Sequence, residues 1–197
     1  GAVSSGMGVL DFKRRPSEVV DLQAAAAVGQ GRLFHIYTEL FAHESVVTAQ
    51  VLLTAFDVAA RTQYLNARNT LNRLLDWRVV PIINENDTTS TDELRFGDND
   101  TLAAQVALLV KADLLVLLTD TDGLYTADPH SDESAHLITR VEDLEELISV
   151  KLGAVGPLGS GGMATKINAA RMAISGGVET VIARGTRPDV LKACVAG

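Results

Sequence analysis

The sequence predicts an α/β protein, a three-layer sandwich in which helices cover both faces of a mainly parallel central sheet. Helical and strand-like segments alternate along the chain, which is typical of a parallel sheet. The strand-like segments 79–83 and 114–118 are continuous apolar runs, as expected of strands covered on both faces. The 197 residues are 47% hydrophobic and 21% charged, a composition that indicates a folded globular chain.

In the first half of the chain, apolar residues three or four apart predict helices over residues 19–41 and 69–77. β-Branched and apolar residues predict strands over 46–53 and 79–83. Gly29 and Gly31 lie inside the first of these helices and indicate close packing there. The glycine-rich opening, residues 1–8, is typical of a loop that follows a strand.

In the second half, Asp98 is suited to cap one helix, and Gly176 with Gly177 to end another. Pro188 fits the first turn of the last helix. The expected elements are helices over 98–110, 141–150, 165–175 and 188–195, and strands over 114–118 and 178–183.

Charge and composition exclude several classes of protein. The net charge is -8, and no basic run is longer than residues 13–15, which argues against a nucleic acid as the partner. The longest apolar runs, such as 114–118, are far shorter than a membrane helix requires. Cys194 is the one cysteine and cannot form an internal disulfide. With no signal peptide at its start, we expect a cytoplasmic protein.

Polar side chains follow the strand 79–83 and precede the next helix. Most side chains of residues 84–89 can donate or accept hydrogen bonds and also tolerate turn geometry. Further along the chain, a helix begins with Asp98, Asn99 and Asp100. A polar loop and a helix cap would explain part of this pattern, but capping needs only one acidic residue. Because parallel α/β folds bind ligands at the carboxyl ends of their strands, we expect a polar ligand here.

Two later segments suit a nucleotide. Thr119 and Asp120 follow the strand 114–118, where a ribose or base would lie, although turn formation alone is the competing explanation. Glycines at 159–162 lead into a helix that carries Lys166, and exposed backbone N–H groups with a lysine attract phosphate. The segment is not a Walker A loop, and a helix rather than a strand precedes it, which disfavours a Rossmann site.

These motifs together resemble the amino acid kinase family, and most closely its branch that phosphorylates glutamate. The resemblance covers essentially the whole chain. It rests on four motifs in the right order, supported by residues 23–30 and 65–70. The four motifs are NEND at 84–87, GDND at 97–100, TDTDGLYTADP at 119–129 and GGMATK at 161–166.

The resemblance implies ATP-dependent phosphorylation of the γ-carboxylate of L-glutamate, with Mg²⁺, as the first step of proline biosynthesis. It also implies feedback inhibition by proline and assembly into a homodimer or homotetramer. Asp87 and Asn99 would hold glutamate with Asp98 close by, Asp100 would orient the catalytic lysines, and Lys166 would neutralise the transferring phosphoryl group. The residues implied to contact ATP are Thr119, Asp120, Ser160, Gly161, Gly162, Met163, Ala164, Thr165 and Lys166.

We expect residues 1–197 to form one amino acid kinase domain that is truncated at its N-terminus and at its C-terminus. The family's first strand, with a phosphate-binding lysine, and a substrate-binding serine would precede Gly1. Many relatives carry a further RNA-binding-like domain at the C-terminal end. We therefore expect this chain alone to be impaired as a catalyst.

Two other functions remain open on these residues. One is a kinase of the same fold with another acceptor. The other is a non-catalytic module that binds glutamate or proline, which the incomplete phosphate site would favour.

Overall fold

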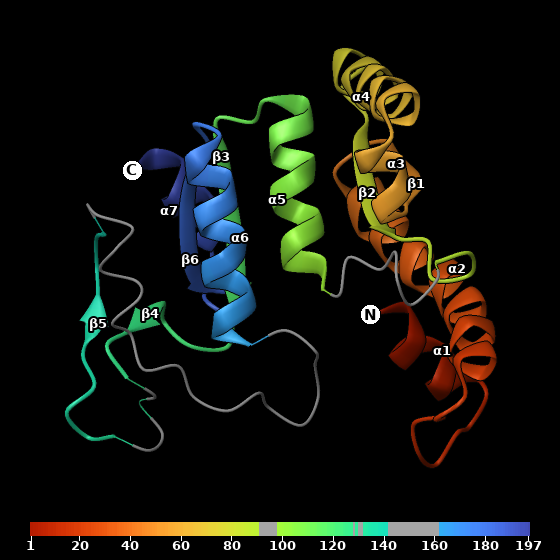
Figure 1. Cartoon of the computed structure of the whole chain (residues 1–197), viewed down its shortest axis with the longest axis horizontal. Helices are drawn as coiled ribbons and strands as arrows, with labels where there is room; N and C mark the ends of the chain where they lie inside the picture. Colours follow the sequence, from red (N-terminus) through yellow and green to blue (C-terminus); the bar gives the residue numbers. More distant parts are fainter. Residues whose placement is uncertain (91–97, 128, 130–131, 142–161) are drawn as a thin grey trace. The chain divides into compact units, whose positions relative to one another are not determined.

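A computed structural model describes residues 1–90, 98–127, 129, 132–141 and 162–197. The chain divides into two compact units, which we call unit 1 (Gly1–Phe96) and unit 2 (Gly97–Gly197). The elements of unit 1 are α1 (Ala2–Val9), α2 (Val19–His43), β1 (Thr48–Leu53), α3 (Ala55–Ala59), α4 (Arg61–Asp76) and β2 (Val80–Glu85) (Figure 1). Those of unit 2 are α5 (Asn99–Val110), β3 (Leu114–Thr119), β4 (Leu124–Tyr125), β5 (Leu137–Ile138), α6 (Met163–Ser175), β6 (Glu179–Arg184) and α7 (Val190–Ala196).

In unit 1, β1 and β2 pair in parallel along their whole length. The chain crosses from one strand to the other through α3 and α4. Thr54 begins α3 with a capping box, in which the Thr54 N–H donates to the Asp57 carboxylate at 2.7 Å and the Asp57 N–H donates to Thr54 Oγ1 at 3.4 Å. The register ends with Leu53 opposite Glu85, so both strands present their carboxyl ends at one edge.

The glycine-rich opening of the chain forms the helix α1 rather than a loop. α1 packs along α2, and the residues in contact are small. A Cβ on Gly29 would collide with the backbone of Ala2 and Gly6, and one on Gly6 with the backbone of Ala25. The close packing predicted for α2 is therefore confirmed at Gly29. It is wrong at Gly31, where an added Cβ would have nothing within 4 Å.

In unit 2, β3 and β6 pair in parallel from Leu114 opposite Glu179 to Thr119 opposite Arg184. α5 and α6 pack against each other and against these strands. Alanines allow this close approach, and the buried core consists of Ala104, Ala107, Leu115, Leu117, Ala169, Ala170, Ala173 and Val178. α6 ends as predicted at Gly176, and Gly177 follows with a φ of +85°, a conformation that glycine adopts at no steric cost.

The predicted α/β class with mainly parallel pairing is confirmed. The described strands form three two-stranded sheets, the parallel pairs β1–β2 and β3–β6 and the antiparallel pair β4–β5. The predicted elements correspond to α2, β1, α4, β2, α5, β3, α6, β6 and α7. The predicted helix over 141–150 falls almost wholly outside the described residues.

Three differences from the expected elements have local causes. α4 begins at Arg61, eight residues before the predicted start, because its first turns are polar and carry little apolar periodicity. α3 is five residues long and depends on its capping box. β4 and β5 have two residues each, too few for a period-two pattern.

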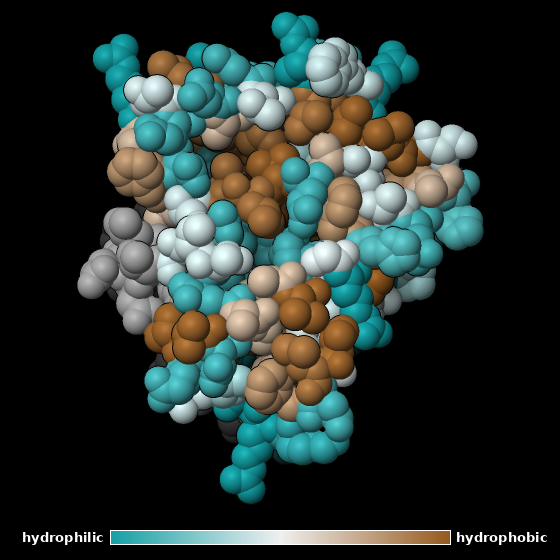
Figure 2. Space-filling view, turned by 90° about the vertical axis from the view of Figure 1, so that its right-hand side faces the viewer, coloured by the Kyte–Doolittle hydropathy of each residue, from teal (hydrophilic) through white to brown (hydrophobic). Residues whose placement is uncertain are grey.

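Large apolar side chains remain exposed on unit 1. Val20, Val47, Leu40 and Trp77 are 68%, 64%, 61% and 67% exposed. Figure 2 shows hydrophobic patches between polar residues on one face of the molecule. Patches of this kind often mark contact surfaces.

We predict that Gly29→Ala lowers the free energy of unfolding by about 1–3 kcal/mol, because its methyl group must displace the backbone of α1. Gly31→Ala is the matched control, two residues away on the same helix and with open space. It should raise the free energy of unfolding by about 0.5–1 kcal/mol. Urea denaturation of both variants measures the difference, and equal values would contradict the packing of α1 on α2.

Candidate functional site

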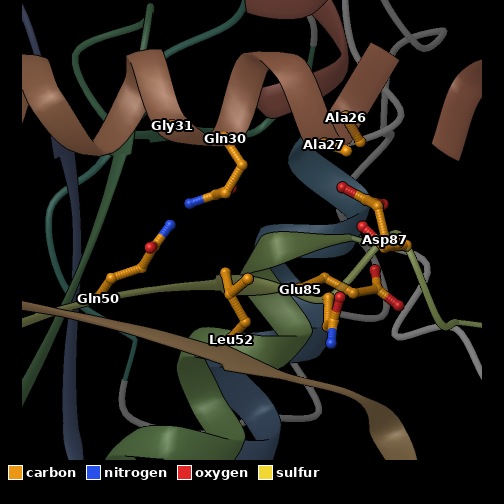
Figure 3. Close-up of a pocket in the computed structure, with 10 residues that line it drawn as sticks. Ala26, Ala27, Gln30, Gly31, Gln50, Leu52, Glu85 and Asp87 are labelled. Carbon is orange, nitrogen blue, oxygen red and sulfur yellow. The ribbon is translucent and has the colours of Figure 1, made fainter. Parts of the chain in front are cut away.

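A pocket of about 330 Å³ lies in unit 1 between α2, β1 and the loop after β2 (Figure 3). Part of the pocket lining is small or apolar and includes Gly31 and Leu52. Small-molecule sites have volumes of roughly 300–1,000 Å³, so this pocket suits a ligand of amino-acid size. Its polar lining residues are Gln30, Gln50, Glu85, Asn86, Asp87 and Thr88.

Two buried amides meet beside this pocket. Asn84 Nδ2 donates to Gln30 Oε1 at 2.8 Å, and the two residues are 7% and 8% exposed. Gln30 Nε2 is buried and has no hydrogen-bond partner among the described residues. Figure 3 shows this nitrogen pointing toward the side-chain amide of Gln50. An unpaired buried donor costs about 1–3 kcal/mol, so an acceptor supplied by a ligand would be favourable here.

Two carboxylates, those of Glu85 and Asp87, lie on the other side of the pocket (Figure 3). The buried Ser90 hydroxyl donates to Glu85 Oε1 at 2.8 Å, and Gln23 Nε2 donates to the Ser90 carbonyl at 3.2 Å, which ties the loop to α2. None of the described residues that line the pocket is basic. Carboxylates attract a cation and repel an anion.

In unit 2, the first turns of α5 and α6 hold a charged cluster of Asp100, Thr165 and Lys166. Lys166 Nζ donates to both carboxylate oxygens of Asp100, at 2.9 and 3.1 Å. The Thr165 hydroxyl donates to the same carboxylate at 2.7 Å. The side chains of Lys166 and Asp100 are 14% and 15% exposed, so this ion pair is largely removed from solvent and its geometry is well defined.

The two residues before Asp100 lie at the start of the same helix. Asp98 is the N-cap of α5, as predicted, and accepts from the Thr101 N–H at 2.7 Å and from the Thr101 hydroxyl at 3.1 Å. Asn99 is the first residue of α5, and it is exposed. Capping thus accounts for the geometry of Asp98, and Asn99 is solvent-exposed at the start of the helix.

Thr119 and Asp120 lie at the carboxyl end of β3, where the sequence placed them. The Thr119 hydroxyl donates to Asp120 Oδ1 at 3.2 Å, and Asp120 is exposed. On the neighbouring strand, Arg184 Nε donates to Asp122 Oδ1 at 2.7 Å. The ends of β3 and β6 therefore combine carboxylate, hydroxyl and guanidinium groups at one edge of the sheet.

The glycine-containing segment before α6 is described in part. Gly162 is the N-cap of α6, and its carbonyl accepts from the Thr165 N–H at 3.2 Å. Met163 and Ala164 form the first turn of α6. Ser160 and Gly161 lie outside the described residues.

The structure thus brings Asp100, Thr165 and Lys166 together in unit 2, with Asp98 and Asn99 beside them in sequence, and places Asp87 in the pocket of unit 1. The sequence analysis did not select Gln30 and Gln50 as candidate site residues. Gln30 ends the run 23–30 that resembles the kinase family, which was the available signal. Gln50 lies in an apolar strand and carried no such signal.

No helix in the described part of the chain is both long enough and apolar enough to cross a bilayer. Within the same residues, no three His, Cys, Asp or Glu side chains converge as a preformed metal site would require.

Comparison with known proteins places these residues in context. A family model described as "Amino acid kinase family" matches residues 3–184. A glutamate 5-kinase of Carboxydothermus hydrogenoformans is 51% identical over 185 residues, which are 93% of this chain and 50% of that protein. One of Chromohalobacter salexigens is 53% identical over 197 residues, which are 100% of this chain and 52% of that protein.

Among solved structures, isopentenyl phosphate kinase matches with a TM-score of 0.63 at 17% identity, over 97% of this chain and 75% of that chain. That similarity shows the fold alone. The chain spans about half the length of the curated relatives it matches.

The Asp100–Lys166 pair yields a prediction about stability. Single variants Asp100→Asn and Lys166→Met each leave one polar partner uncompensated, whereas the double variant removes both, so the double-mutant cycle should show a coupling of about 1–3 kcal/mol. The matched control is the Lys13–Asp11 pair, which is 81% and 83% exposed and should couple by less than about 1 kcal/mol. Urea denaturation gives both couplings, and a value near zero for Asp100 and Lys166 would contradict a structural ion pair.

Proposed function

Because the chain belongs to the amino acid kinase family, we propose that it transfers the γ-phosphoryl group of ATP to the γ-carboxylate of L-glutamate. The observation that carries this proposal is the identity of 48–53% with proteins named glutamate 5-kinase, which extends over all 197 residues for several of them. The product would be an acyl phosphate, L-glutamyl 5-phosphate. The proposal assigns both units to one kinase domain.

The chemistry explains why the candidate residues are of these types. The γ-carboxylate of glutamate is already ionised at neutral pH, so it can attack without a general base. The obstacle is repulsion between two anions, which positive charges and N–H donors relieve in the transition state. A site for this reaction therefore needs a lysine near the phosphoryl group and a separate pocket for the amino acid.

Unit 1 supplies the features expected of the amino-acid pocket. Asp87 and Glu85 suit the ammonium group of glutamate, and the absence of basic residues among the described lining residues disfavours ATP there. In this proposal Asp87 and Asn99 bind glutamate, with Asp98 close to Asn99.

Unit 2 supplies the features expected of the phosphoryl-transfer site. Lys166 Nζ has three N–H donors, and two of them engage Asp100, which leaves a donor for a phosphoryl oxygen. Asp100 thereby orients Lys166. Thr119, Asp120 and the segment 160–166 would contact ATP.

Mg²⁺ would accompany ATP in this reaction and neutralise phosphate charge. In such sites Mg²⁺ keeps several waters and takes one or two carboxylates together with phosphate oxygens. No preformed metal site lies among the described residues, so phosphate oxygens and water would supply most of the ligands of the ion.

The family resemblance also leads us to propose L-glutamate and ATP as the small-molecule partners, proline as a feedback inhibitor and a homodimer or homotetramer in the cytoplasm. The exposed apolar side chains of unit 1, such as Trp77 and Val20, support contact with another protein surface.

We predict that Lys166→Ala lowers the turnover of the intact enzyme with L-glutamate and ATP about 10²-fold or more, the scale of losing a charged transition-state contact. Trapping the acyl phosphate with hydroxylamine measures the rate. Lys192→Ala is the control, because this lysine pairs with Asp189 on the surface of α7, and it should leave the rate unchanged. If wild-type protein forms product with aspartate, N-acetylglutamate or UMP instead of glutamate, the proposed acceptor is wrong.

Asp87→Ala should act on the other substrate. Loss of its carboxylate removes a partner of the substrate ammonium group, so the KM for L-glutamate should rise about tenfold or more while the KM for ATP changes little. Steady-state kinetics with each substrate varied in turn would show this. A rise in the KM for ATP alone would place Asp87 at the nucleotide rather than at the amino acid.

A further inference from the structure

The hydroxyl of Thr165 lies between two oxygen acceptors at the start of α6. It is 2.7 Å from Asp100 Oδ2 on the neighbouring helix α5 and 2.8 Å from the carbonyl oxygen of Gly162, three residues earlier in the chain. A hydroxyl has one proton to donate, so the two acceptors compete for it. The result decides whether Thr165 serves its own helix or the ion pair of Asp100 with Lys166.

The carboxylate of Asp100 is the stronger of the two acceptors. Hydrogen bonds to an ionised group are shorter and roughly twice as strong as those between neutral groups, and the contact with Asp100 is the shorter one. The Gly162 carbonyl has other donors, because it also accepts from the N–H groups of Thr165 and Lys166 at 3.2 and 3.4 Å. The hydroxyl proton of Thr165 therefore belongs to Asp100.

This hydrogen bond holds the carboxylate more rigidly than Lys166 can. Lys166 Nζ donates to both oxygens of Asp100 at 2.9 and 3.1 Å, but a lysine is a point charge on a flexible four-carbon stem and can follow a rotating carboxylate. Thr165 is branched at Cβ and has few χ1 rotamers in a helix. Its hydroxyl approaches Oδ2 from one direction, which restrains the carboxylate and with it the position of Lys166 Nζ.

The position of Lys166 in its helix also depends on this carboxylate. The lysine lies in the first turn of α6, where the helix dipole disfavours a cation. Asp100, in the first turn of α5, offsets that charge. The side chains of Lys166 and Asp100 are 14% and 15% exposed, and among the described residues the Thr165 hydroxyl is the one other donor to the carboxylate.

We propose that Thr165 is a positioning residue of the phosphoryl-transfer site, whose hydroxyl holds the Asp100 carboxylate in the orientation that leaves one N–H of Lys166 for the phosphoryl group. This inference rests on the proposed function, because it takes Lys166 as the lysine that meets the transferred phosphoryl group. The sequence resemblance implied that Thr165 contacts ATP, whereas in this proposal its hydroxyl acts through Asp100.

Steady-state kinetics of the intact enzyme with L-glutamate and ATP test this role. Thr165→Val keeps the shape of threonine without its hydroxyl, and it should lower kcat about tenfold or more while each KM changes less than about twofold. Thr165→Ser keeps the hydroxyl and should restore kcat to within about threefold of wild type. A hydroxyl that binds ATP in the ground state would instead raise the KM for ATP.

A double-mutant cycle shows whether Thr165 acts through Asp100. Asp100→Ala should itself lower kcat. In that background Thr165→Val should lower kcat less than about twofold further, because the carboxylate that the hydroxyl holds is already gone. Two residues that act independently would give losses that multiply.

Thr38→Val is the matched control for the loss of a helix hydroxyl. Thr38 is half-buried in α2, where its hydroxyl contacts the Phe34 carbonyl and the Thr48 hydroxyl at 3.1 Å each, and it does not line the pocket of unit 1. This variant should leave kcat unchanged. Urea denaturation of both valine variants then separates a loss of stability from a loss of rate.

Three results would overturn the inference while glutamyl phosphate still forms: an unchanged kcat in Thr165→Val, a serine variant as slow as the valine variant, or multiplying losses with Asp100→Ala. The proposed function fails separately. If the wild-type enzyme phosphorylates a different acceptor, and Thr165→Val slows that reaction with the same coupling to Asp100, the proposed acceptor is wrong and the role of Thr165 stands. A wild-type enzyme that transfers no phosphoryl group to any acceptor overturns both.

Discussion

In each unit, two strands run in the same direction, and their carboxyl ends therefore meet at one edge. β1 and β2 end with Leu53 opposite Glu85, and β3 and β6 end with Thr119 opposite Arg184. The side chains that follow these strands are polar, and they gather because the backbone hydrogen bonds of a parallel pair allow no other arrangement of the strand ends. The pocket of unit 1 and the polar edge of unit 2 both depend on this constraint.

The helices contribute further polar side chains to the pocket of unit 1 and to the charged cluster of unit 2. Gln30 reaches the pocket of unit 1 from α2 and binds Asn84 of β2, while Lys166 of α6 meets Asp100 of α5 in unit 2. Both contacts join polar side chains that are largely buried. Contacts of this kind add little net stability but leave a large penalty when one partner is missing, so they define the orientation of an amide and of an ammonium group.

The described polar groups of the two units differ in charge. The described lining of the unit 1 pocket has carboxylates and amides and no basic residue, whereas the first turn of α6 carries a lysine beside its N-terminal N–H groups. Carboxylates repel a phosphate, whereas the N–H groups at a helix N-terminus attract one.

The sequence by itself determined the α/β class, most of the helices and strands, the Asp98 cap and the polar residues after β2 and β3, because these depend on local periodicity and turn chemistry. It also named Asp100 and Lys166, through their resemblance to known motifs. Only the tertiary structure decided that α1 is a helix packed on Gly29, that the Thr165 hydroxyl joins Lys166 at the Asp100 carboxylate, and that Gln30 turns a buried nitrogen toward Gln50. Each of these requires residues distant in sequence to meet, and no local pattern records which side chains a folded chain brings into contact.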